Sequence, residues 1–168
     1  MKIKNKYLIL FNLICIILLI IPVFWLNPFN ENYSTLSLDT KGYFYLLTTG
    51  LSCGILSSYE YYHTLRKYWY LGFISFFMGC IIPHHVPYDF QGNMHLLFSY
   101  TGFGLMMIST LLNIYMHNEK TILNIISIVM IVCVYLIYRY MMVTTLCELF
   151  ITLSVLIINM YIYLKYTD

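Results

Sequence analysis

The sequence contains no alanine in its 168 residues and little charge, with nine basic and seven acidic residues. Soluble domains carry charge on about a quarter of their residues, whereas here charged residues make up 10% of the chain and apolar residues 61%. So little charge would not keep a protein of this size dispersed in water. The composition therefore excludes a soluble globular protein and predicts an integral membrane protein.

Three further absences narrow the class of protein. The net charge is only +2 and no run of lysine or arginine is present, which argues against a nucleic-acid partner. The five cysteines form no Cys-x-x-Cys pair, so we interpret them as small buried apolar residues and not as a disulfide framework. No Ala-x-Ala-like site follows the first apolar run, which favours a retained membrane anchor over a cleaved signal peptide.

Long apolar segments fill most of the chain. A membrane-spanning helix needs about 20 mostly apolar residues, and the mean hydropathy of the whole chain is +0.76. We predict an all-α, multi-pass helical bundle that forms a single membrane domain over residues 1–168. About six transmembrane helices are expected, at residues 7–26, 43–62, 68–82, 94–116, 122–141 and 144–164.

The basic residues predict how these spans are oriented. If the N-terminus is cytoplasmic, seven of the nine basic residues fall on the cytoplasmic side, and only Lys41 and Arg139 fall outside. Cytoplasmic loops carry the excess of lysine and arginine in membrane proteins. We therefore predict that both termini are cytoplasmic and that the protein lies in the cell membrane.

Polar and small residues recur at helical spacing inside the apolar segments. Asn113 follows His95 by eighteen residues, or five turns of 3.6 residues, so both lie on one face. Such faces are expected to point into the bundle, where small residues allow helices to approach closely. The predicted stripes are His95, Ser99, Gly102, Ser109 and Asn113; Gly72, Gly79 and Pro83; Thr49, Cys53 and Glu60; and Glu148, Thr152 and Asn159, with a further Gly50-x-x-x-Gly54 spacing.

Ionisable residues gather on the predicted outer side. The connection at residues 83–95 holds three of the five histidines, and Arg139 and Glu148 flank the last hairpin on the same side. In contrast, Glu60 and His63 with Arg66 and Lys67 are interpreted as an interfacial charge cluster on the inner side. The candidate ligand-binding residues are His95, Glu148, Arg139, Asp89 and Asn113.

Three hypotheses account for the outer residues. In a structural interpretation, Glu148 pairs with Arg139 or His95 as a buried, neutralised charge. In a second, imidazoles and carboxylates bind zinc, although no His-x-x-x-His or His-Glu-x-x-His motif is present. In a third, the residues form a pocket for a lipid headgroup or a small polar ligand. The candidate metal ligands are His84, His85, His95 and Asp89.

The third and fourth segments resemble a known family. The run Gly72-x6-Gly79-x3-Pro83, followed by a short polar loop that ends on Gly92 and His95, resembles small bacterial membrane proteins filed as domain of unknown function 998. That resemblance implies a six-span bundle in a bacterial cytoplasmic membrane and no established enzymatic activity.

Two other similarities are more local. Cys147-Glu148-Leu149-Phe150 is similar to a Cys-Glu-aromatic element in the DRAM-like relatives of that family, which would make His95 and Glu148 shared polar positions. Asp89, followed by His95 at the start of an apolar span, resembles the glycopeptide-resistance VanZ-like proteins.

These observations predict a non-enzymatic membrane protein with a polar pocket in the outer leaflet. The pocket would bind a lipid or small amphiphile in a sensing, accessory or transport role, with membrane lipids as partners and no cofactor. One alternative is an intramembrane metal-dependent hydrolase, with His84, His85, His95 and Asp89 as metal ligands and Glu148 as the acid or base. Another is a structural subunit that packs its polar stripes against other membrane subunits.

Overall fold

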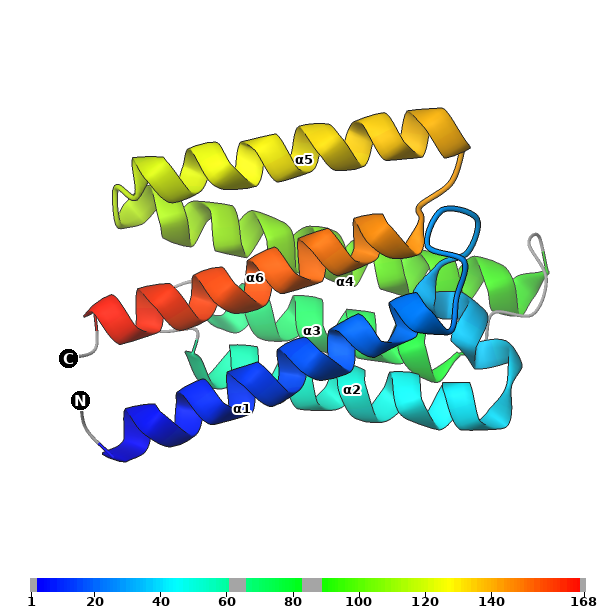
Figure 1. The fold of residues 1–168 in the computed structure, drawn as a ribbon, viewed down its shortest axis with the longest axis horizontal. Helices are drawn as coiled ribbons and strands as arrows, with labels where there is room; N and C mark the ends of the chain where they lie inside the picture. The colour runs from blue at the N-terminus through cyan, green and yellow to red at the C-terminus, as the bar shows by residue number, and fades with distance from the viewer. Residues whose placement is uncertain (1–2, 61–65, 83–88, 167–168) are drawn as a thin grey trace.

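A computed structural model describes residues 3–60, 66–82 and 89–166 of the protein, and all the regular secondary structure in this part is helical (Figure 1). The predicted all-α class is therefore confirmed. In chain order the elements are α1 (Ile3–Ile20), the 3-10 helices η1 (Ile21–Phe24) and η2 (Tyr33–Leu38), α2 (Thr40–Glu60), α3 (Arg66–Ile81), α4 (Phe90–Met116), α5 (Lys120–Tyr140) and α6 (Thr145–Tyr166).

Local sequence explains where several helices begin and end. Pro22 lacks an N–H donor, and α1 changes there into the 3-10 helix η1. Asp89 caps α4 by accepting a hydrogen bond from the Gly92 N–H at 2.5 Å. Met141 ends α5 in the left-handed conformation, with a φ of 56°. The Met141 conformation separates α5 from α6, although the hydropathy pattern alone shows these two helices as almost one apolar run.

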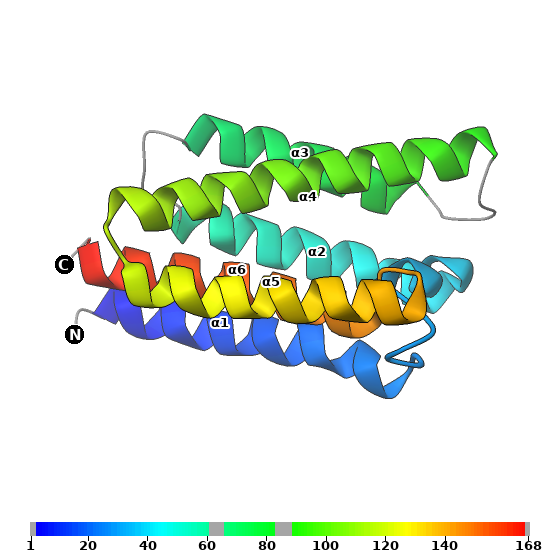
Figure 2. The ribbon, with the colours of Figure 1, turned by 90° about the horizontal axis from the view of Figure 1, so that it is seen from above.

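The six α-helices run along the long axis of the molecule (Figure 1). The start of α1 and the end of α6 lie at one end of the bundle, which we call the terminal end. The residues between α1 and α2 lie at the opposite end, the loop end. Figure 2 shows α3 and α4 side by side on one side of the bundle and α1, α5 and α6 on the other. Both chain ends therefore belong to the same end of the molecule.

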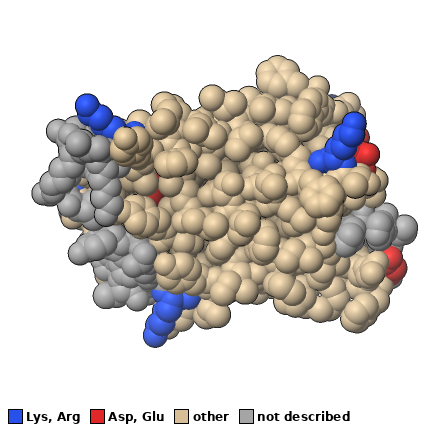
Figure 3. Space-filling view, turned by 90° about the horizontal axis from the view of Figure 1, so that it is seen from below, with Lys and Arg blue, Asp and Glu red and all other residues tan. Residues whose placement is uncertain are grey.

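Within the described residues, four helices are long and apolar enough to cross a membrane, at Lys6–Phe24, Phe90–Met116, Lys120–Tyr140 and Thr145–Tyr166. Helix α3 has 16 residues and spans about 24 Å, less than the hydrocarbon thickness of a bilayer. Helix α2 has 21 residues, but glycine, serine and threonine reduce its apolar character. In Figure 3, charged side chains gather towards the two ends and a wide uncharged band lies between them.

Glycines bring α3 and α4 into backbone contact. A Cβ atom added to Gly102 of α4 would lie 2.2 Å from the Phe76 nitrogen and 2.6 Å from the Gly72 oxygen. A Cβ atom on Gly79 would lie 2.2 Å from Ser99 Oγ. Any side chain at these positions would push the two helices apart. The predicted inward stripes on these two helices are confirmed where they are described; Pro83 lies outside the described residues.

The stripe on α2 also faces inward. Thr49 is buried, and Glu60 is only 1% exposed. A Cβ atom on Gly54 would lie within the Phe73 ring of α3, so glycine is needed for that ring to pack against α2. The interpretation of Glu60 as part of an interfacial charge cluster is therefore wrong. The side chains of His63 and Arg66 lie outside the described residues, and Lys67 is exposed.

Candidate functional site

His95, near the start of α4, contacts the end of α3 and the 3-10 helix η2 at the loop end. Its ring is 3% exposed, and Nδ1 lies 2.9 Å from the Gly79 oxygen and 2.8 Å from the Ile82 oxygen. Because carbonyl oxygens only accept, Nδ1 must carry the hydrogen and donate it. These carbonyls are at the end of α3, where the last turn has no intrahelical donors. His95 therefore caps α3, and its Nε2 lies 2.9 Å from Ser34 Oγ in η2.

Glu148 lies in the first turn of α6, where the loop between α1 and α2 folds over the helix. Its Oε2 atom accepts the Tyr33 N–H at 2.5 Å. The loop also supplies carbonyl acceptors for the N–H groups of that turn, since Thr145 N donates to Glu31 O at 2.7 Å and Leu146 N to Pro28 O at 3.3 Å. A carboxylate in this position is also favoured by the helix dipole. The loop is thus held against the start of α6.

The two predicted residues therefore belong to one network but do not pair directly. Tyr33 and Ser34 are consecutive, and the first bonds Glu148 while the second contacts His95. Burial raises the pKa of the Tyr33 phenol, and the nearby Glu148 charge raises it further. The phenol stays protonated and donates to the Leu19 oxygen at 2.5 Å. We call His95, Ser34, Tyr33 and Glu148 the loop-end network.

The other predicted site residues lie elsewhere. Asp89 is an exposed helix cap, and Arg139 is exposed and forms no ion pair with Glu148. Asn113 is buried on the same face of α4 as His95, but it lies near the terminal end of the helix. His84 and His85 lie outside the described residues. Of the predicted residues that the structure describes, only His95 and Glu148 are therefore brought into one network.

The described residues contain no group of three or more His, Cys, Asp or Glu side chains placed to hold a metal ion. The nitrogens of His95 are occupied by two carbonyl oxygens and a hydroxyl. The five cysteines are free thiols, and Cys147 Sγ donates to the Cys133 oxygen at 3.6 Å, from α6 to α5. These groups act in helix packing and leave the proposed zinc site without a described ligand set.

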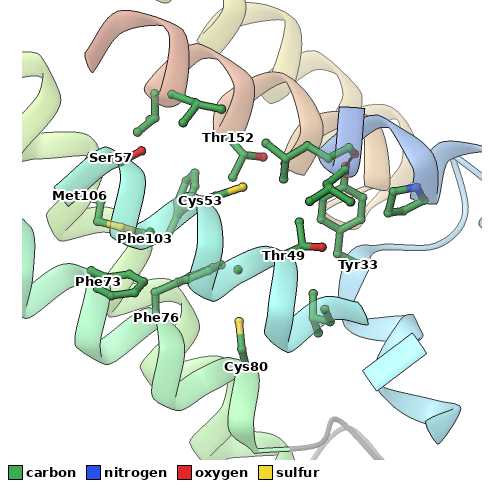
Figure 4. Close-up of a pocket in the computed structure, with 18 of the residues that line it drawn as sticks. Tyr33, Thr49, Cys53, Ser57, Phe73, Phe76, Cys80, Phe103, Met106 and Thr152 are labelled. Atoms are coloured by element: carbon green, nitrogen blue, oxygen red, sulfur yellow. Dashed lines mark hydrogen bonds between the residues drawn. The ribbon is translucent and has the colours of Figure 1, made fainter. Parts of the chain in front are cut away.

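An apolar cavity of about 90 Å³ lies beside the loop-end network (Figure 4). It extends from Pro22 and Tyr33 near the loop end to Trp69, which is buried near the start of α3. Figure 4 shows Phe73, Phe76 and Phe103 along one side and Cys53 near the middle of the lining. Tyr33 belongs both to this lining and to the loop-end network.

Three hydroxyl groups in the lining are turned towards the backbone. The Tyr33, Tyr45 and Thr152 hydroxyls donate to the backbone carbonyl oxygens of Leu19, Leu18 and Glu148, respectively. Their hydrogens are therefore not offered to a molecule in the cavity. An apolar cavity of this kind takes an apolar group in preference to water.

Sequence reasoning predicted part of the cavity lining. Thr49 and Cys53 on α2 and Thr152 on α6 belong to stripes that were predicted to face inward, and all three residues line the cavity. The aromatic wall from α3 and the contribution of Tyr33 were not predicted. The sequence feature that could have indicated a cavity at this position was the Gly50-x-x-x-Gly54 spacing, because both glycines line it.

Comparison of the chain with protein-family models, curated proteins and solved structures finds no match. The resemblance to the bacterial membrane family remains a prediction.

A second polar cluster closes the terminal end between α4, α5 and α6. Lys165 Nζ and the Tyr166 hydroxyl each donate to Glu119 Oε1 at 2.5 Å. The Tyr166 ring stacks on His117 with a centroid separation of 4.1 Å. This cluster lies at the surface and joins the end of α6 to the turn before α5.

The cluster predicts a loss of stability in acid. The hydrogen bonds from Lys165 and Tyr166 lower the pKa of Glu119 below its ordinary value of 4.5. A lowered carboxyl pKa stabilises the fold above the ordinary value and loses that effect as the pH falls through the lowered value. We expect the melting temperature in detergent to fall between about pH 5 and pH 3, and less steeply in Glu119→Gln. Equal slopes in both proteins would contradict this assignment.

Proposed function

We propose that this is a non-enzymatic, multi-pass membrane protein that holds part of an acyl chain of a membrane lipid, or a small amphiphile, in the cavity beside the loop-end network. The observation that carries the proposal is the cavity itself, an apolar space bordered by polar groups at the loop end. A lipid or small amphiphile has this distribution of apolar and polar parts. Membrane lipids are thus the proposed partners, in a sensing, accessory or transport role.

The orientation is part of the proposal. We infer six spans, with the terminal end cytoplasmic and the loop end at the outer leaflet of a cell membrane. The basic residues support this arrangement, since Lys6, Lys120 and Lys165 belong to the terminal end of their helices. The loop end would then lie at the outer headgroups, with the cavity at the depth of the acyl chains.

Photolabelling tests the proposal. The purified protein is reconstituted with phosphatidylglycerol that carries a photoactivatable diazirine on one acyl chain. We expect crosslinks on cavity residues such as Cys53 and Phe76, mapped by mass spectrometry. Gly50→Leu should reduce them about tenfold, equivalent to a weakening of about 1.4 kcal/mol, because the new side chain occupies the cavity.

Gly104→Leu is the matched control. A Cβ atom on Gly50 would lie 3.9 Å from Cys80 Sγ inside the lining, whereas one on Gly104 meets nothing within 4 Å. The two variants add the same apolar side chain to two helices of the same bundle. Crosslinks confined to exposed helix faces, or equal cavity labelling in both variants, would overturn the proposal.

A further inference from the structure

Asn12 and Glu60 form a polar pair buried between α1 and α2. Each is only 1% exposed, although Glu60 is the last residue of α2. Asn12 Nδ2 donates to the Leu8 oxygen at 3.0 Å and to Glu60 Oε1. Because an amide nitrogen carries two hydrogens, these two bonds use both of its donors.

Two acceptor atoms of this pair have no hydrogen-bond partner among the described residues. They are Glu60 Oε2 and Asn12 Oδ1, both enclosed within the protein. As a carboxylate, Glu60 would therefore keep a negative charge in an apolar environment, and one amide N–H is the only donor that the described residues supply to it. Such a buried, uncompensated charge is strongly unfavourable, and an ionisable residue at this position marks a functional site.

No cation compensates this carboxyl group among the described residues. Lys6 precedes Asn12 on α1 and Lys67 follows Glu60 at the start of α3, and the side chains of both lysines are exposed. The titratable group that faces Glu60 from α1 is the Cys15 thiol, which carries no positive charge. From α6, Tyr163 packs on the neighbouring Tyr59, with ring centroids 5.7 Å apart.

We propose that Asn12 and Glu60 form a proton-binding site, with the proton on Glu60 Oε2. The protonated oxygen becomes a donor, and Asn12 Oδ1 is the acceptor that lacks one. The carboxylic acid and the amide would then each donate one hydrogen bond to the other and accept one from it, and the second amide hydrogen would stay on the Leu8 oxygen. A single proton therefore removes the charge and satisfies both unpartnered atoms.

The number of oxygen atoms favours a proton over a metal ion. Hard metal cations take about six oxygen ligands or more, whereas this pair has two unpartnered oxygens. The site also joins α1 to α2, so the proton stabilises the contact between these helices. Loss of the proton would leave a carboxylate at that contact and weaken it.

Carbodiimide labelling of the full-length protein in detergent tests the site directly. Dicyclohexylcarbodiimide adds to carboxyl groups in their protonated form, and the adducts are located by mass spectrometry. At neutral pH we expect about tenfold more adduct on Glu60 than on Glu119, with less on Glu60 as the pH rises. Absence of the Glu60 adduct would overturn the proposal. Protection by sodium chloride relative to potassium chloride would also overturn it, because the ligand would then be sodium.

A pair of variants gives a second readout. Glu60→Gln supplies an N–H in place of the acid O–H, so we expect a melting temperature near that of the unaltered protein at neutral pH. As the pH rises from about 4.5, the ordinary pKa of a glutamate carboxyl, the unaltered protein should lose thermal stability until Glu60 is deprotonated in the folded state, while Glu60→Gln does not. Glu119→Gln is the control and should retain this loss. The same loss in Glu60→Gln would contradict the proposal, and the labelling result tests the proposal independently if that variant does not fold.

Discussion

Gly102→Ala is expected to destabilise the protein by about 3 kcal/mol or more, because overpacking here involves backbone atoms. The new Cβ atom would lie 2.2 Å from the Phe76 nitrogen and 2.6 Å from the Gly72 oxygen. A flexible side chain could rotate away, but two helix backbones can only separate. Thermal unfolding in detergent, followed by circular dichroism, measures the loss.

Gly104→Ala is the matched control for this substitution. It lies two residues away on the same helix, and its Cβ atom would meet nothing within 4 Å. Alanine is favoured over glycine in a helix by about 1 kcal/mol, so this variant should be as stable as the unaltered protein or slightly more stable. If the two variants behave alike, α3 and α4 are not in backbone contact at Gly102.

His95→Ala is expected to destabilise the protein by about 3 kcal/mol, because it leaves buried carbonyl groups unpaired and creates a void. The imidazole Nδ1 contacts the Gly79 and Ile82 oxygens, and Nε2 contacts Ser34 Oγ. Its removal therefore affects the end of α3, the start of α4 and the loop together. The measurement is again thermal unfolding, combined with proteolysis of the loop end.

Ser34→Ala separates the contact of His95 with the loop from its capping of α3. It removes only the contact between the ring and the loop, and leaves the two carbonyl contacts in place. We expect a loss of about 1 kcal/mol, the usual net effect of one hydrogen bond, and faster proteolysis of the loop. An unchanged stability in His95→Ala would show that the ring does not cap α3.

Helical periodicity predicted which faces point inward. The stripe on α4 places His95 and Asn113 on one face, and both are buried. The stripe on α2 likewise pointed Glu60 into the protein, although its position near Arg66 and Lys67 suggested an interfacial charge. Periodicity was the better guide, because the direction of a side chain follows from its helix and not from its neighbours in sequence.

Pairing between segments was not predictable in the same way. Glu148 bonds the Tyr33 N–H, 115 residues away in sequence, and no spacing rule connects a backbone donor in a loop to a carboxylate in a helix. Asn12 had a signal, as an amide within an otherwise apolar segment. Whether Asn12 pairs with Glu60 depends on how far α2 extends beside α1, and only the packing of the helices determines that.

The sequence by itself determined an all-helical protein with long apolar helices, because the scarcity of charge and the length of the apolar runs are properties of the chain alone. It also determined which faces of α2, α3 and α4 are buried, through the 3.6-residue repeat. The tertiary structure decided that His95 caps α3, that the loop covers the start of α6, and that a cavity remains beside Tyr33. These features depend on the distances between helices, which are fixed at points such as Gly102 where two backbones touch.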